Sequence, residues 1–172
     1  LIKAQKKILN SSKVKWIKKL KKFTKSPCIF IANEFFDALP IKQFQKNGLT
    51  WYEKFIQISD KKKLNFIDKK VNIKKVERII NLKISKNQNF IEFSPLTLEY
   101  LKNIFKIIKK YKGGLLIIDY GNFEKKMEDT LKSIYEKKYS KVLENIGKSD
   151  ITYNINFYLI KKIVKNFKNL NF

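Results

Sequence analysis

The chain has 172 residues, which suits one domain, and 44% of them are apolar, which is enough for a packed core and argues against disorder. It contains one cysteine, Cys28, and no histidine, so it forms no internal disulfide and offers no histidine for acid–base catalysis or a metal site. No apolar run reaches the roughly 18 residues that a membrane-spanning helix requires.

Lysine dominates the charge of the chain. The net charge is +24, from 39 Lys+Arg against 15 Asp+Glu, and Arg78 is the only arginine. Such a charge raises the hypothesis of a nucleic-acid-binding or protein-interaction module, which a cluster of lysines on one face would favour. The lysines are spread along nearly the whole chain, however, and base recognition relies on arginine. We therefore interpret most of them as solvated surface and disfavour nucleic acid as a partner.

The first part of the chain predicts a helix, a buried strand and a hairpin. Apolar residues have helical spacing over residues 1–9. The continuous apolar run over 28–32 is typical of a strand that is buried on both faces of a parallel sheet. The Asn-Gly pair at 47–48 predicts a two-residue type I′ turn, which joins strands over 42–46 and 49–58.

The middle of the chain predicts a strand over 64–67, a helix over 74–82 and a strand over 90–93. Ser94 as N-cap and Pro95 in the first turn then predict a long helix, which we expect to end at the glycine pair 113–114. A second buried strand follows over 115–118.

The last part of the chain is expected to be helical in part over 127–143. A final amphipathic helix is predicted over 156–167, with Phe157, Ile160, Val164 and Phe167 facing inward. The order of buried strand, hairpin, helix and buried strand predicts an α/β fold, in which residues 41–93 form an insertion that contains the hairpin.

Polar side chains follow both buried strands. Asn33 and Glu34 come directly after the first strand, and Asp119 follows the second. In open α/β sheets, ligands bind at the carboxyl ends of the strands. These two strand ends are therefore the first candidates for a binding site.

The first strand end belongs to a longer series of motifs. The series reads Asn-Glu-Phe-Phe-Asp-Ala-Leu-Pro at 33–40, Ile-x-x-Phe at 41–44, Trp-x-Glu at 51–53, Glu-x-Ser-Pro at 92–95, Gly-Gly at 113–114, Asp-Tyr-Gly at 119–121, Asp-Thr-Leu at 129–131 and Gly-x-x-Asp-Ile-Thr at 147–152. In this order it resembles the MidA-type methyltransferases, the family of the mitochondrial complex I assembly protein arginine methyltransferase.

The resemblance implies a class I, Rossmann-like methyltransferase sheet and S-adenosyl-L-methionine as cofactor. Residues 1–172 would be the C-terminal or central part of one methyltransferase domain. The family's Gly-rich cofactor loop has no match among the five glycines, so we expect this loop upstream of Leu1. The 172-residue chain alone is then expected to be inactive and to bind the cofactor poorly.

The resemblance also implies a substrate, and the chain itself shows nothing that demands import into an organelle. The expected function is methylation of a protein arginine, on a quinone-module subunit of respiratory complex I during its assembly. The bacterial cytoplasm is the expected compartment, with the mitochondrial matrix as the alternative. The alternative function is a catalytically incompetent, lysine-rich fragment that acts as a nucleic-acid or protein interaction module.

Three residues after the first strand are the candidates for catalysis. Methyl transfer from a sulfonium is an in-line displacement, so the enzyme mainly aligns and desolvates the two reactants. Glu34 is the leading candidate for a carboxylate that pairs with the acceptor guanidinium, and Asp37 is the second. Asn33 would position the acceptor or line the cofactor methyl group. For Asp37, a capping role in the turn after the strand is the alternative.

Further candidates for substrate binding are Asp119, Tyr120, Asp150 and Thr152. The alternative for the first pair is a tight turn, and for the second pair a turn or a cap. Asn154 and Asn156 stand where family members often have His and Asp, which puts any role of those two side chains in doubt. Asn156 remains suited to cap the last helix.

Overall fold

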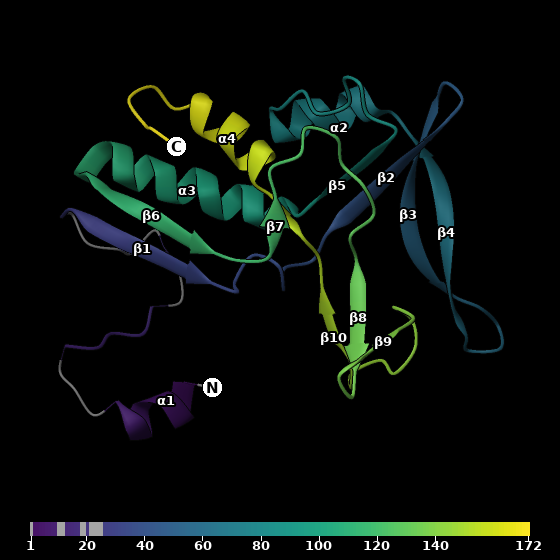
Figure 1. The fold of residues 1–172 in the computed structure, drawn as a ribbon, viewed down its shortest axis with the longest axis horizontal. Coiled ribbons are helices and arrows are strands. Elements are labelled where there is room, and N and C mark those ends of the chain that lie inside the picture. The colour runs from purple at the N-terminus through teal and green to yellow at the C-terminus, as the bar shows by residue number, and fades with distance from the viewer. Residues whose placement is uncertain (1, 10–12, 18–19, 21–25) are drawn as a thin grey trace.

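The computed structural model describes residues 2–9, 13–17, 20 and 26–172 (Figure 1). Its helices are α1 (Ile2–Ile8), α2 (Ile73–Ile80), α3 (Pro95–Tyr111) and α4 (Phe157–Lys165). Its strands are β1 (Cys28–Asn33), β2 (Lys42–Asn47), β3 (Thr50–Ile58), β4 (Leu64–Val71), β5 (Phe90–Phe93), β6 (Gly113–Ile118), β7 (Gly121–Asn122), β8 (Lys132–Tyr135), β9 (Lys138–Ser140), β10 (Asp150–Thr152) and β11 (Ile155–Asn156). The mixture confirms the α/β class. Among the described residues, no helix is both long and apolar enough to cross a bilayer.

Strands β1 and β6 form a parallel pair, with α3 and α4 on one side of it (Figure 1). On the helix side, Leu115 and Ile117 pack against the core. On the other side, Ile29 and Ile31 are 77% and 69% exposed. The expectation of strands buried on both faces is therefore wrong for the described residues. Successive strand side chains point to opposite faces, and the helices cover only one of them.

The close contact of β1 and β6 depends on Gly113. A Cβ atom at this position would lie 1.8 Å from the carbonyl oxygen of Cys28, its partner in the register. Its φ of +120° also disfavours any side chain. The preceding helix ends at Tyr111, with Lys112 as C-cap and Gly113 directly after it. Gly113 therefore makes room for the neighbouring strand, and the prediction that the helix ends at the glycine pair is confirmed, because the position after the C-cap is where a helix-ending glycine lies.

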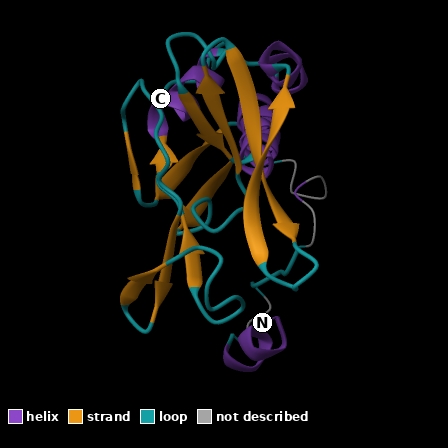
Figure 2. Ribbon diagram, turned by 90° about the vertical axis from the view of Figure 1, so that its right-hand side faces the viewer, coloured by secondary structure: helices purple, strands orange, loops and turns teal. Residues whose placement is uncertain are grey.

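A second, antiparallel sheet has the strand order β4-β3-β2-β5, and its twisted strands face the viewer in Figure 2. The β2–β3 hairpin is present as predicted, but Asn47 pairs with Thr50, so Gly48 and Leu49 are the central residues of the turn. Only Gly48 has a positive φ, +57°. This arrangement belongs to type II′ turns, so the predicted type I′ turn at 47–48 is wrong. Glycine adopts a positive φ without the steric cost that leucine would incur.

Polar side chains begin α2, α3 and α4. Asn72, Ser94 and Asn156 each accept a hydrogen bond from a backbone N–H in the first turn of the helix that follows. This confirms the predicted caps Ser94 and Asn156. Of the side chains expected to face inward from α4, Ile160 and Val164 are buried, and Phe157 and Phe167 pack partly buried against the core.

The prediction of partial helix over 127–143 is wrong. This segment contains the β8–β9 hairpin instead, and β10 pairs with its first strand. Glu136 and Lys137 in its turn both have positive φ values, 49° and 65°, as type I′ turns require. The Ser133 and Ser140 hydroxyls lie 2.8 Å apart across the two strands. Cross-strand hydrogen bonds thus outweigh the weak helical spacing of the sequence.

Candidate functional site

The loop after β1 carries the leading site candidates. Glu34 has a positive φ of 44°, which is uncommon for a residue with a side chain and occurs most often where the surrounding structure enforces it. Its backbone N–H donates to the Ile118 carbonyl at 2.8 Å, so this hydrogen bond joins the start of the loop to the last residue of β6. Asn33 and Glu34 are both exposed. The described residues give the Glu34 carboxylate no hydrogen-bond or ion-pair partner.

Asp119, directly after β6, holds this loop in place. Its Oδ2 accepts hydrogen bonds from the backbone N–H groups of Phe36 at 3.0 Å and Asp37 at 3.3 Å. Its Oδ1 accepts one from the N–H of Tyr120 at 2.9 Å. Burial raises the pKa of Asp119, and the negative charge of Asp37 adds to this rise, while the N–H groups oppose it.

Asp37 connects the loop to β10. Its Oδ2 accepts a hydrogen bond from the Thr152 hydroxyl at 2.8 Å. Its Oδ1 is buried and has no hydrogen-bond partner among the described residues. A buried carboxylate oxygen without a donor is costly in free energy. This atom is therefore an acceptor of the loop that still lacks a donor.

The structure brings together Asp37, Asp119 and Thr152, three residues that are far apart in the sequence. It leaves the remaining substrate-binding candidates at the surface. Tyr120 is 64% exposed, and Asp150 is an exposed residue of β10. The side chains of these two residues take no part in the hydrogen bonds that the structure describes around Asp37.

The two aromatic residues of the loop have different environments. Phe36 is fully buried, whereas Phe35 is 40% exposed. The Phe35 ring makes edge-on contacts with the rings of Phe36 and Tyr100, at centroid distances of 5.2 Å and 5.3 Å. Phe36 thus belongs to the core. Phe35, which follows Glu34 in the chain, leaves part of its ring exposed.

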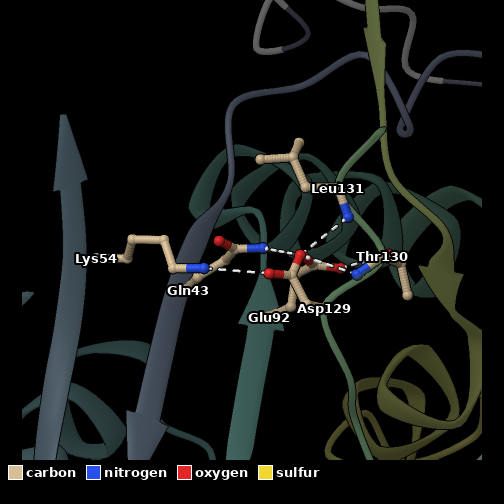
Figure 3. A network of polar contacts seen from close by, with 6 residues as sticks. All are labelled: Gln43, Lys54, Glu92, Asp129, Thr130 and Leu131. Atoms are coloured by element: carbon tan, nitrogen blue, oxygen red, sulfur yellow. Dashed lines mark hydrogen bonds and ion pairs between the residues drawn. The ribbon is translucent and has the colours of Figure 1, made fainter. Parts of the chain in front are cut away.

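A second polar cluster surrounds Glu92 on β5 (Figure 3). The side-chain N–H group of Gln43 donates to Glu92 Oε2 at 2.6 Å and to Asp129 Oδ1 at 2.7 Å. The backbone N–H and the hydroxyl of Thr130 also donate to Glu92. Lys54 pairs with Asp129 at 3.1 Å. Burial raises the pKa of Glu92, although the hydrogen bonds from Thr130 and Gln43 favour its charged form.

The Glu92 cluster supports the segment that follows Thr152. The Thr130 hydroxyl accepts a hydrogen bond from the Asn154 N–H at 2.9 Å. Tyr153, between Thr152 and Asn154 in the chain, is buried, and burial raises the pKa of its hydroxyl to about 12. The phenol therefore stays protonated at neutral pH. The two clusters are linked through the short stretch from Thr152 to Asn154.

The sequence contained a weak signal for the Glu92 cluster. Glu92 stands between the apolar residues Ile91 and Phe93, and Gln43 is its partner in the register of β2 and β5. Alternation predicts that both polar side chains lie on the same face of the sheet. Whether that face is buried depends on residues 129–130, which are distant in the sequence, so the cluster was missed.

The glycines of the described chain do not form a cofactor loop. Gly48 lies in the β2–β3 turn, Gly113 and Gly114 begin β6, Gly121 begins β7 and Gly147 lies in the turn before β10. None of them lies between the carboxyl end of a strand and the start of a helix, where a Gly-rich loop allows close approach to a cofactor. The glycines thus form no such loop, and no group of Cys, Asp and Glu side chains among the described residues is arranged to hold a metal ion.

Residues 1–172 match the sequence model of a family described as "Putative S-adenosyl-L-methionine-dependent methyltransferase". The chain is 28% identical over 153 residues to "Protein arginine methyltransferase NDUFAF7 homolog, mitochondrial" of Caenorhabditis elegans, and 32% identical over 139 residues to "Protein arginine methyltransferase NDUFAF7, mitochondrial" of Xenopus tropicalis. These alignments include 88% and 78% of this chain but 36% and 31% of the relatives. The chain thus spans about a third of the length of these relatives.

Two solved structures from Burkholderia thailandensis resemble the fold. A COG1565 superfamily member bound to S-adenosyl-homocysteine gives a TM-score of 0.70 at 18% identity, over 96% of this chain and 43% of that one. A native structure of a COG1565 superfamily protein gives a TM-score of 0.72 at 16% identity, over 96% and 46%. The likeness confirms the Rossmann-like sheet that the motifs predicted.

Proposed function

Because the chain belongs to this family of S-adenosyl-L-methionine-dependent methyltransferases, we propose that it forms the acceptor-binding side of an enzyme that methylates arginine in a protein. The names of the curated relatives support arginine as the acceptor. The family description supports S-adenosyl-L-methionine as the methyl donor, and one related structure contains S-adenosyl-homocysteine.

The observation that carries the proposal is a pair of carboxylates at the carboxyl end of β1. Glu34 is exposed without a partner, and Asp37 has a buried oxygen without a donor among the described residues. A guanidinium presents a planar fork of N–H donors that matches carboxylates in geometry and charge. In the proposed site Glu34 binds the guanidinium and orients one nitrogen, and Asp37 is the second acceptor.

The other candidates have supporting roles in this proposal. Asp119 is a positioning residue, because its carboxylate fixes the backbone of the loop at Phe36 and Asp37. Thr152 orients the Asp37 carboxylate through its hydroxyl. The exposed Tyr120 and Asp150 contact the protein substrate at the rim.

The cofactor supplies a methyl group on a sulfonium, and Asn33 lines that side of the proposed site. Asn33 is the last residue of β1 and is exposed next to Glu34. Because no glycine lies in a loop between a strand end and a helix start, we assign none of the described residues except Asn33 to cofactor binding. The contribution of this chain is then to align and desolvate the acceptor nitrogen.

We further propose a quinone-module subunit of respiratory complex I as the substrate protein. The support is the resemblance of the motif series to the complex I assembly methyltransferases. Several curated relatives carry the word mitochondrial in their names, which favours the mitochondrial matrix over the bacterial cytoplasm as the compartment. Fractionation of source cells, with detection of the protein by antibody, tests the compartment.

The activity is tested with the natural full-length protein and S-adenosyl-L-methionine that carries an isotopically labelled methyl group. The acceptors are arginine-containing peptides that tile the quinone-module subunits of complex I. We expect mass spectrometry to find the label on an arginine of one region. Label on another side chain would overturn the acceptor class, and absence of label from every peptide and from the intact subunits would overturn the substrate.

A further inference from the structure

A groove with a volume of about 950 Å³ is lined by residues of α2, of the turn after it and of the end of α4. Cations line it from both helices: Lys74, Arg78 and Lys83 from α2 and the turn after it, and Lys162 and Lys165 from the end of α4. The groove contains none of the candidate methyltransferase residues. We propose that it is a second binding site, which takes a compact oligophosphate.

The protein offsets the cations of this groove only in part, because Glu77 attracts Lys83 and the Lys162 ammonium lies 5.0 Å from the centre of the Tyr158 ring. None of them forms an ion pair with a carboxylate among the described residues. Glu77 is the acidic residue in the lining, and its Oε1 already accepts hydrogen bonds from the backbone N–H groups of Ile84 and Ser85 and from the Ser85 hydroxyl. Most of the positive charge is thus left for a ligand.

The ends of the two helices reduce this charge without cancelling it. The groove lies at the carboxyl ends of α2 and α4, and each helix end is equivalent to about half a negative charge. Together with Glu77, they leave a surplus of about three positive charges from the five cations. Such a surplus suits a ligand that carries several negative charges in a small volume.

Arg78 favours phosphate chemistry in particular. It is the only arginine among the 39 basic residues of the chain, and its guanidinium has no hydrogen-bond partner among the described residues. Lysine would serve equally well to offset the dipole of a helix end. A guanidinium differs from an ammonium in its planar fork, which binds two oxygens of one phosphate at once.

The lining of the groove disfavours a nucleic-acid strand as its ligand. No aromatic side chain is among the lining residues that the structure describes, so the groove offers no platform on which bases could stack. Its volume of about 950 Å³ lies at the upper end of the range for small-molecule sites, roughly 300–1,000 Å³. The charge surplus and the absence of stacking side chains among the described lining residues together favour an oligophosphate over a nucleic-acid strand.

Calorimetric titration of the natural full-length protein with sodium tripolyphosphate, at low salt, tests the proposal. The test variant is K74Q/R78Q/K165Q, which removes three exposed cations of the groove. The matched control is K61Q/K62Q/K63Q, which removes the same charge from exposed residues of the β3–β4 turn. We expect one site, weakened at least roughly tenfold in the test variant, because the variant removes charge-assisted hydrogen bonds to the phosphates. The control should bind nearly as the wild type does.

Arg78→Lys provides a second variant that keeps the charge and removes the fork. We expect it to weaken tripolyphosphate binding severalfold with an unchanged unfolding midpoint. Equal losses in the test and control variants would show diffuse attraction to a polycation and overturn the site. Tighter binding of an octaglutamate peptide or of single-stranded RNA, with the same dependence on Arg78, would overturn the oligophosphate class.

Discussion

The two carboxylate oxygens of Asp37 have unequal partners, because Thr152 donates to one and no described group donates to the other. Thr152→Val keeps the shape of the side chain and removes that donor. We expect the free energy of unfolding to fall by about 1–3 kcal/mol, the usual cost of a buried polar group that loses its partner. Urea unfolding measures the change. Thr50→Val is the control, since no hydrogen bond of its hydroxyl is found among the described residues, and an equal loss in both variants would contradict the prediction.

Glu92 makes stability depend on pH in a defined direction. Burial raises its pKa, so the folded chain binds this proton more tightly than the unfolded chain does. Its contribution to stability is therefore complete below the ordinary pKa of glutamate and is lost as the pH rises through the raised value. Glu92→Gln removes this titration.

We therefore expect the stability difference between the wild type and Glu92→Gln to favour the wild type most in acid and to shrink as the pH rises through that window. Urea unfolding at a series of pH values measures it. Glu128→Gln, at an exposed position, is the control variant. A wild-type advantage that grows toward alkaline pH would contradict the assignment of the raised pKa to Glu92.

Among the secondary-structure elements, the pairing of β1 with β6 offers a sharp comparison between adjacent glycines. Gly113→Ala places a Cβ against the Cys28 carbonyl, whereas a Cβ on Gly114 meets nothing within 4 Å. We expect Gly113→Ala to lower the free energy of unfolding by more than about 3 kcal/mol, and Gly114→Ala to change it by less than about 0.5 kcal/mol. Thermal unfolding of both variants decides this. Similar midpoints would show that the strands do not approach as closely as described.

Elements with local determinants were predictable from the sequence. Ser94 and Pro95 specify the start of α3 without help from distant residues, and a glycine marks the β2–β3 turn. Residues 127–143 were not predictable, because the β8–β9 hairpin depends on pairing with β10 and on hydrogen bonds from Thr130 to Glu92. No pattern within the segment itself contains that information.

The candidate site was predictable as a set of motifs and not as a geometry. Order along the chain gives no indication that Asp119 would bind the backbone of residues 36–37, or that Thr152 would reach Asp37. These contacts depend on how the ends of β1, β6 and β10 meet in space. The sequence also gave no sign that Asp37 Oδ1 would be buried without a described partner.

For the molecule as a whole, the net charge of +24 implies strong self-repulsion. The ion pairs among the described residues involve Lys42, Lys54 and Lys141, so most of the described lysines form no ion pair with a carboxylate. Raising the salt concentration from about 0.01 M to about 0.15 M shortens the Debye length from about 30 Å to about 8 Å. We expect the free energy of unfolding, measured with uncharged urea, to increase over this range. A decrease would mean that ion pairs stabilise the fold more than repulsion destabilises it.

The most direct measurement is the rate of methyl transfer by the natural full-length protein and its Glu34→Gln variant, with the arginine peptide that accepts the label. Loss of a charge-assisted pair of about 1.5–3 kcal/mol lowers kcat/KM by roughly tenfold to a hundredfold. Glu128→Gln, which removes an exposed carboxylate outside the β1 loop, should keep the wild-type value. If Glu34→Gln also keeps the wild-type kcat/KM, the loop after β1 does not bind the acceptor guanidinium as proposed.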